Sequence, residues 1–218
     1  IAESGVDANI SLKLTQLGLA FDEGLARENL TRVLEEAARR RIFVRGDMES
    51  SAWTQKTLDL FYALKPRLPG CGIVLQSCLR RTEADVKEAV ARGVRVRLCK
   101  GAYREPAERA FQDKDEVNAN YDKCAVLLTK APLPAFATHD DARIEAALKA
   151  CDAAGLVKSD YEIQMLYGLR ARRRRELMVQ GHVVRVYVPY GTHWFPYFYR
   201  RVRERKENAM FVLRNLFE

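Results

Sequence analysis

Short apolar or β-branched runs alternate with longer stretches of helical periodicity along the chain. Each short run is bounded by polar or turn-forming residues, which is typical of a strand buried in a sheet. In the longer stretches apolar residues return every three or four positions, as at Leu30, Val33 and Leu34, and predict amphipathic helices. Thr82 and Asp85 predict a capping box at the start of one of them. We expect strands in seven runs, 8–14, 41–47, 71–77, 94–100, 133–139, 161–166 and 182–188.

This alternation predicts an α/β fold whose parallel sheet is built from βα units. A doubly wound sheet that binds a dinucleotide has a glycine-rich turn after its first strand. Here Gly70 and Gly72 precede a strand, and no third glycine completes the motif. The regular spacing of the runs instead favours a (βα)8 TIM-like barrel. Such a barrel has eight strands, so either one strand lies N-terminal to this chain or the pattern hides one.

The composition predicts one domain with a basic surface. The chain has 218 residues, 48% of them hydrophobic, which is enough for one sizeable core over 1–218. Its 37 Lys and Arg against 29 Asp and Glu give a net charge of +8, concentrated in the runs 170–175 and 200–206. Neither run carries a nucleic-acid-binding motif, so we expect the first to be a solvated helix face and expect no nucleic acid partner. A basic nucleic-acid-binding module stays an alternative, and salt-dependent retention on heparin would reveal it.

The spacing of cysteines and histidines does not favour a metal site. The five cysteines never form CxxC, and the three histidines stand far apart with no HExxH motif. We therefore expect no metal, no disulfide framework and a reducing compartment. No apolar run approaches the roughly 20 residues of a membrane span, and the N-terminus lacks a signal pattern, so we expect a soluble protein.

Polar side chains follow or interrupt every predicted strand near its carboxyl end. In a barrel these ends converge on one mouth, so residues far apart in the sequence would meet in space. The set is rich in hydrogen-bond donors, which suits a large anionic cofactor with a pyrophosphate and a planar ring. A barrel aldolase that uses Lys13 or Lys100 as a Schiff-base lysine is an alternative. The strand-end residues are Lys13, Asp47, Gln76, Arg97, Lys100, Thr138, His139, Gln164 and Tyr187.

Arg200 and Arg201 follow a run of aromatic residues that begins at Tyr187 and includes Tyr197. An arginine pair beside aromatic rings predicts either a pocket that holds a small anion or a part of the basic surface. Adjacent helical residues diverge by about 100° around the helix axis, yet both arginines can reach a carboxylate that lies between them. The sequence leaves both interpretations open.

Seven stretches, taken in order, resemble the FAD-dependent proline dehydrogenases. They begin at residue 11 and end at residue 201, so the resemblance covers most of the chain. Each stretch alone is weak, whereas seven in one order are highly specific. The stretches are SLKLTQLG (11–18), DMES (47–50), VLQS (74–77), RLCKGAY (97–103), FATHD (136–140), EIQMLYG (162–168) and YVPYGTHWFPYFYRR (187–201).

The resemblance implies a distorted (βα)8 barrel with FAD at its C-terminal mouth. L-proline would give hydride from the ring carbon beside its nitrogen to flavin N5, forming pyrroline-5-carboxylate, and a quinone would reoxidise the flavin. The catalytic residues implied are Lys13, Asp47, Arg97 and Tyr187. The substrate-binding residues implied are Lys13, Leu166, Tyr187, Tyr197, Arg200 and Arg201. The cofactor-binding residues implied are Gln76, Arg97, Lys100, Gly101, Ala102, Thr138, His139, Gln164 and Glu204, with Arg97 near flavin N5.

One part of the family pattern has no counterpart here. The first barrel strand of the family ends in a glutamate that pairs with a carboxylate-binding arginine, and residues 1–10 contain no such strand. The resemblance therefore predicts a single domain without its N-terminal strand and helices. It also implies a cytoplasmic protein, with peripheral association at the inner membrane left open for a bacterium, or a mitochondrial one in a eukaryote.

Overall fold

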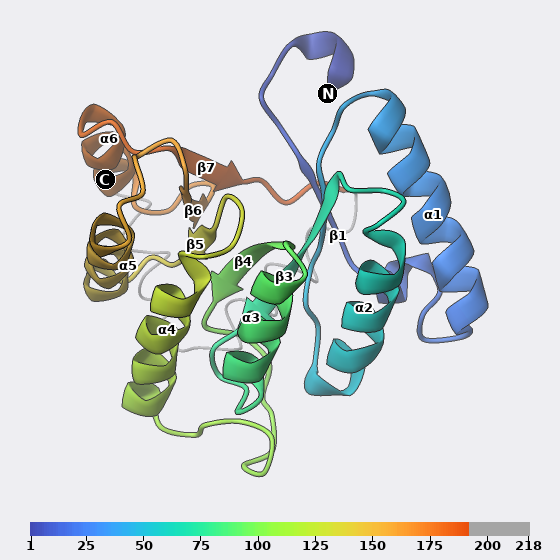
Figure 1. The fold of residues 1–218 in the computed structure, drawn as a ribbon, viewed down its shortest axis with the longest axis horizontal. Helices are drawn as coiled ribbons and strands as arrows, with labels where there is room; N and C mark the ends of the chain where they lie inside the picture. The colour runs from blue at the N-terminus through green and yellow to red at the C-terminus, as the bar shows by residue number, and fades with distance from the viewer. Residues whose placement is uncertain (192–218) are drawn as a thin grey trace.

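The computed structural model describes residues 1–191. At its centre lies one parallel sheet in the order β1-β2-β3-β4-β5-β6-β7, with the α-helices arranged around it (Figure 1). Each strand falls inside one of the runs predicted from the sequence, so the predicted strands are confirmed. The strands are β1 (Ile10–Leu12), β2 (Val44–Gly46), β3 (Cys71–Gln76), β4 (Arg95–Cys99), β5 (Ala135–Ala137), β6 (Glu162–Leu166) and β7 (Val184–Tyr187).

The sheet is curled but does not close within the described residues. Every strand pairs in parallel with the next one along the chain, while β1 and β7 form the two ends of the strand order. Residues 1–191 therefore form a seven-stranded half-barrel. The predicted parallel α/β architecture is confirmed, and the complete eight-stranded barrel is not formed by this part of the chain.

Helices occupy the connections between strands, as parallel pairing requires. Asp22, Asp113 and Asp140 each precede a helix and accept a hydrogen bond from a first-turn amide, which satisfies donors that have no partner inside the helix. The helices are η1 (Ala2–Ser4), η2 (Leu14–Leu17), α1 (Glu23–Arg39), α2 (Ser51–Leu64), α3 (Thr82–Ala91), α4 (Lys114–Leu128), α5 (Asp141–Ala153) and α6 (Ala171–Val179).

The capping box predicted for α3 is wrong. Thr82 is the first helical residue and not the cap, and its hydroxyl donates to the main-chain oxygen of Gln76 at the end of β3. Asp85 pairs with Arg81 at 2.7 Å. The hydroxyl of Thr82 therefore satisfies a strand-end carbonyl in place of a helix amide, and it joins the start of α3 to the end of β3.

The two faces of the sheet differ sharply in chemistry. The outer face packs on the helices. Gly46, for example, lies so close to the Phe61 ring of α2 that a Cβ would come within 2.3 Å of it. Alternate residues of a strand point to opposite faces, so Arg45 and Asp47 lie on the inner face. The outer core includes Leu30, Leu34, Leu58, Phe61, Ile73, Val96, Phe136, Ile144 and Ile163.

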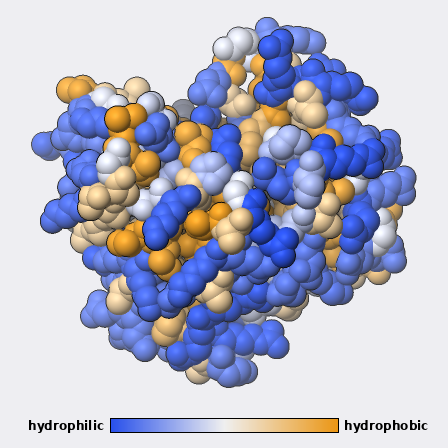
Figure 2. Space-filling model, viewed as in Figure 1, coloured by the Kyte–Doolittle hydropathy of each residue, from blue (hydrophilic) through white to orange (hydrophobic). Residues whose placement is uncertain are grey.

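The surface follows from this packing. Figure 2 shows a face on which hydrophilic residues cover most of the outer helix surfaces, with apolar residues towards the middle. Among residues 1–191 no helix combines the length and the hydropathy that crossing a membrane requires.

Candidate active site

Arg97 of β4 is the centre of a polar cluster on the inner face of the sheet. Its Nη2 donates to Asp47, which follows β2, and its Nη1 donates to Ser11 Oγ at 3.3 Å and Gln164 Oε1 at 3.5 Å. Asp47 also accepts a hydrogen bond of 2.9 Å from the Tyr187 hydroxyl. The Arg97 guanidinium lies 5.3 Å from the centre of the Tyr187 ring. Side chains from β1, β4, β6, β7 and the end of β2 thus meet in one cluster.

The Arg97–Asp47 ion pair makes this cluster nearly neutral. The two side chains are each only 11% exposed, and a buried charge is tolerated mainly when an opposite charge compensates it. Sequence reasoning placed Arg97 and Asp47 at the same mouth without pairing them. The structure adds that the positive charge of Arg97 is shared with Asp47, and that Ser11, which sequence reasoning missed, helps to fix the guanidinium.

A second ion pair lies next to this cluster, towards the start of β6. Gln164 Nε2 donates to Glu162 at 2.8 Å, and Glu162 accepts from Arg185 Nε at 2.9 Å and Nη2 at 2.7 Å. Burial raises the pKa of Glu162, but the hydrogen bonds and charge of Arg185 outweigh it and leave the pKa below its ordinary value. The amide nitrogen of Gln164 is committed to Glu162, so its oxygen faces Arg97.

Arg45 is a buried cation on the same face. It is 0% exposed, and none of its three guanidinium nitrogens has a hydrogen-bond partner among the described residues. Burial, with a smaller contribution from the nearby charge of Arg97, lowers its pKa to about 9. Arg45 and Arg95 both lie over the ring of Phe43, at 5.1 Å and 4.0 Å. The inner face is therefore rich in cationic donors below the strand ends.

Lys100 and Gly101 follow β4 and lie against neighbouring strand ends. Lys100 Nζ pairs with Asp140 at 2.6 Å, which disfavours an aldolase based on Lys100 because a Schiff-base lysine must present a free amine. Gly101 has φ +101°, and a Cβ there would come within 2.4 Å of Cys78 Sγ. Only glycine can therefore bring the main chain of 100–102 this close to β3. Ala102 is half-buried in the same loop.

His139 connects the ends of β5 and β6. Its Nε2 accepts a hydrogen bond of 2.9 Å from the main-chain N–H of Leu166. Burial, with a smaller contribution from the charge of Arg170, lowers the pKa of His139 to about 4. The ring is therefore neutral at pH 7 and carries its proton on Nδ1. Thr138 is buried beside it, and its hydroxyl accepts from the Asp140 N–H at 3.2 Å.

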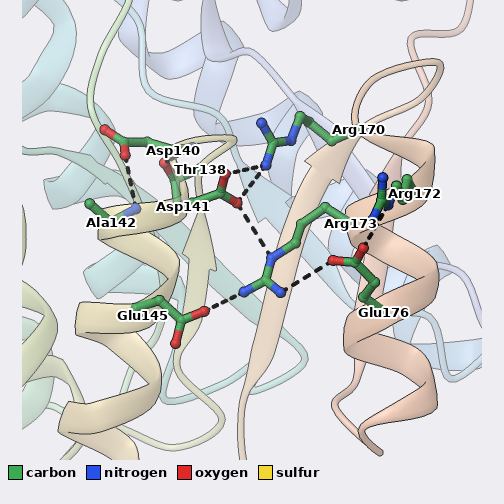
Figure 3. A network of polar contacts seen from close by, with 9 residues as sticks. All are labelled: Thr138, Asp140, Asp141, Ala142, Glu145, Arg170, Arg172, Arg173 and Glu176. Atoms are coloured by element: carbon green, nitrogen blue, oxygen red, sulfur yellow. Dashed lines mark hydrogen bonds and ion pairs between the residues drawn. The ribbon is translucent and has the colours of Figure 1, made fainter. Parts of the chain in front are cut away.

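The arginine run at 170–175 holds two helices together. Figure 3 shows Arg170 and Arg173 reaching Asp141 at the start of α5, while Arg173 also contacts Glu145 and Glu176. The Arg173 side chain is only 16% exposed, so the expected solvated face is wrong for this residue. The Arg172 side chain is 87% exposed, as expected for a solvated helix face. The contacts fix the start of α5 directly after His139.

Lys13 differs from the other cations at the strand ends. Arg97, Lys100 and Arg185 each pair with a carboxylate, whereas Lys13 is half-buried and has no carboxylate within 4 Å among residues 1–191. A half-buried ammonium without a partner favours an external anion. Of the predicted site residues, Tyr197, Arg200, Arg201 and Glu204 lie outside the described residues.

These groups fit a large anionic cofactor better than a metal. Arg97, Gln164 and Gln76 line the inner face, and Gly101 lets the main chain of 100–102 pack against Cys78 and Gln76 beside them. A buried guanidinium beside two fixed side-chain amides fits the ring edge of FAD. Within residues 1–191 no group of three or more His, Cys, Asp or Glu could hold a metal ion.

Known proteins share both this sequence and this fold. The family model described as proline dehydrogenase matches residues 2–214. Proline dehydrogenase 2 of Bacillus subtilis (strain 168) is 38% identical over 217 residues, covering 99% of this chain and 72% of the relative. Proline dehydrogenase of Deinococcus radiodurans is 35% identical over 221 residues, covering 99% of this chain and 71% of the relative.

Solved structures of much longer proteins contain a similar half-barrel. Proline utilization A of Bdellovibrio bacteriovorus, inactivated by N-propargylglycine, gives a TM-score of 0.81 at 29% identity over 89% of this chain. A variant of Bradyrhizobium japonicum proline utilization A gives 0.83 at 24% identity over 99% of the chain, a likeness of fold. This chain spans 24% and 26% of those two proteins. The chain belongs to the proline dehydrogenase family, whose members are oxidoreductases acting on a CH–NH group.

Proposed function

We propose that this chain oxidises L-proline to pyrroline-5-carboxylate at the cluster around Arg97. FAD, when bound, would supply the hydride acceptor at flavin N5, and a quinone would take up the electrons. The quinone, and a cytoplasmic location with peripheral contact to the inner membrane, rest on the family resemblance.

The substrate side of the proposal rests on Lys13 and Tyr187. Lys13 binds the proline carboxylate, because its ammonium has no carboxylate partner in the described part of the chain and a charge-assisted bond offsets the lost hydration of the anion. Leu166 and Tyr187, at the ends of β6 and β7, form an apolar wall for the pyrrolidine ring. Arg200 and Arg201 complete the carboxylate site.

The cofactor side rests on Arg97, Gln76 and Gln164. Arg97 stabilises negative charge at the reduced ring, with Asp47 and Tyr187 holding the guanidinium in place. The two glutamine side chains present fixed amides to the ring edge. The segment from Lys100 to Ala102 would hold the ribityl and phosphate region, with Thr138 and His139 beside it.

One observation supports this proposal most strongly. Arg97, Asp47, Gln164 and Tyr187 come from four separate segments and form one connected cluster in which every charge is compensated. Each of the four lies in a stretch that resembles the proline dehydrogenases. A solvated strand end would not bury an arginine to 9% exposure and surround it with specific acceptors.

The substitution Arg97→Met tests the assignment. We expect the rate of flavin reduction by proline to fall at least tenfold more than the affinity for proline, because a charge beside the ring acts chiefly on the electron-rich state. Stopped-flow absorbance at varied proline concentrations separates the two quantities. Arg95→Met, two residues earlier on β4, is the matched control and should leave both nearly unchanged. Equal losses of rate and affinity in Arg97→Met would assign Arg97 a merely structural role.

A further inference from the structure

Glu49 is a buried carboxylate in the loop 47–50 between β2 and α2, and within residues 1–191 it makes no hydrogen bond to the cluster around Arg97. It is 8% exposed, and both of its oxygens bind a single residue of η2. Oε1 accepts from the Thr15 hydroxyl at 2.6 Å, and Oε2 accepts from the Thr15 main-chain N–H at 3.2 Å. Thirty-four positions separate the two residues in the sequence. Glu49 therefore fixes a distant turn.

The turn that Glu49 holds is the one that begins at Lys13. Lys13 is the N-cap of η2, in extended conformation, and its side chain makes no capping bond. First-turn amides such as that of Thr15 have no partner within the helix. Glu49 supplies the missing acceptor from outside, so the main-chain position of Lys13 depends on a carboxylate of the β2–α2 loop.

The main chain of Glu49 faces the cofactor side of the same site. Its carbonyl accepts a hydrogen bond of 2.8 Å from Gln76 Nε2. This leaves Gln76 Oε1 directed towards Gly101, 3.2 Å from the point that a Cβ there would occupy. A side-chain substitution at Glu49 would release the Lys13 turn while the carbonyl contact to Gln76 stays available.

Stability alone does not account for a carboxylate at this position. Glu49 has no Lys or Arg partner within 4 Å among the described residues, and a buried anion held only by neutral donors is costly. A lysine side chain has many rotamers, so the orientation of its ammonium is reliable only where its main chain is fixed. A rigid acceptor at Thr15 provides that anchor.

We propose that Glu49 is a positioning residue that sets Lys13 for the substrate carboxylate, an inference that rests on the proposed function. The probe is tetrahydrofuran-2-carboxylate, which has the ring and carboxylate of proline but no amine to oxidise. Its dissociation constant is measured from the change in flavin absorbance of the FAD-loaded protein. Flavin content, from the ratio of visible to ultraviolet absorbance, reports the cofactor side independently of activity.

We expect Glu49→Ala to raise the dissociation constant of the probe about tenfold, as loss of a charged hydrogen bond would, and to leave flavin content unchanged. In a Lys13→Ala background the same change should add less than twofold, because there is no ammonium left to position. Glu105→Ala is the matched control. Its carboxylate holds the Ser51 main-chain N–H at 2.7 Å and the Ser51 hydroxyl at the start of α2 in the same way, and its loss should not change probe affinity.

Two variants keep the test decisive if Glu49→Ala does not fold. Thr15→Val removes one donor and should weaken binding of the probe about threefold. Thr15→Ser keeps the hydroxyl and should bind the probe with wild-type affinity. Unchanged probe affinity in Glu49→Ala or Thr15→Val, or an equal loss of affinity with and without Lys13, would overturn this inference. Neither result would contradict the proposed function. A wild-type protein that binds FAD but not the probe would overturn the proposed function together with it.

Discussion

Arg97 and Asp47 form an ion pair, so their contributions to the free energy of unfolding should be strongly coupled. Each side chain is 11% exposed, so removing one partner leaves a nearly buried charge. Such a loss costs about 3 to 5 kcal/mol. Arg97→Met leaves Asp47 with the Tyr187 hydroxyl as its hydrogen-bond donor, and we place its cost near the lower limit, at about 3 kcal/mol.

Substituting the other partner, Asp47, should reduce the free energy of unfolding by less. Asp47→Asn leaves Arg97 with Ser11 and Gln164 as acceptors, so we expect a loss of about 2 kcal/mol. The double variant Arg97→Met with Asp47→Asn leaves no unpaired charge. It should therefore cost no more than Arg97→Met alone, which gives a coupling energy of about 2 kcal/mol.

Urea unfolding of the four proteins at pH 7, all in the same state of cofactor loading, measures this coupling. The matched control is the pair Arg172 and Glu176 on α6, at 3.0 Å with side chains 87% and 41% exposed. An exposed pair of this kind couples by about 0.5 kcal/mol or less. A coupling at Arg97 and Asp47 as small as that of the exposed pair would refute the reasoning.

Two further predictions concern single residues. The folded-state pKa of His139 is lowered to about 4, so below pH 6.5 the unfolded chain takes up a proton that the folded chain does not. The stability present above pH 6.5 should fall by about 3 kcal/mol as the pH drops towards 4. His139→Gln should reduce this pH dependence in urea titrations at pH 7 and pH 5, and an identical dependence would exclude His139 as its source. Arg200→Met and Arg201→Met should weaken proline binding by about 2 kcal/mol with FAD content unchanged, while Arg203→Met and Arg205→Met should do almost nothing. Four equally silent variants in proline kinetics would favour a basic surface over an anion pocket.

The sequence was sufficient for the strands and for the side of the sheet on which the polar groups gather. Both depend on local patterns, since a buried parallel strand is a short apolar run and its carboxyl end is marked by the next polar residue. The pattern also identified Arg97, Asp47, Gln164 and Tyr187 as groups that meet at one mouth. It could not assign the partner of each charge, because that depends on side-chain rotamers set by the packed fold.

Other features were hidden because the contacts are long-range. Arg173 lies in a run that the sequence predicts to be exposed to solvent, yet three carboxylates from α5 and α6 surround it. Ser11 and Glu49 look like ordinary polar residues until Arg97 and Thr15 are brought beside them. Arg45 lies in the middle of a predicted strand, where a charged residue ordinarily faces solvent. Only the curvature of the sheet places it in the interior.

The most direct test of the proposed reaction is the anaerobic addition of L-proline to the purified, FAD-loaded protein. Oxidised flavin absorbs near 450 nm by general flavin chemistry. We predict that this band is lost in proportion to the proline added, that pyrroline-5-carboxylate forms in equal amount, and that a quinone restores the band. A protein that binds FAD and keeps the band unchanged at saturating proline would contradict the account.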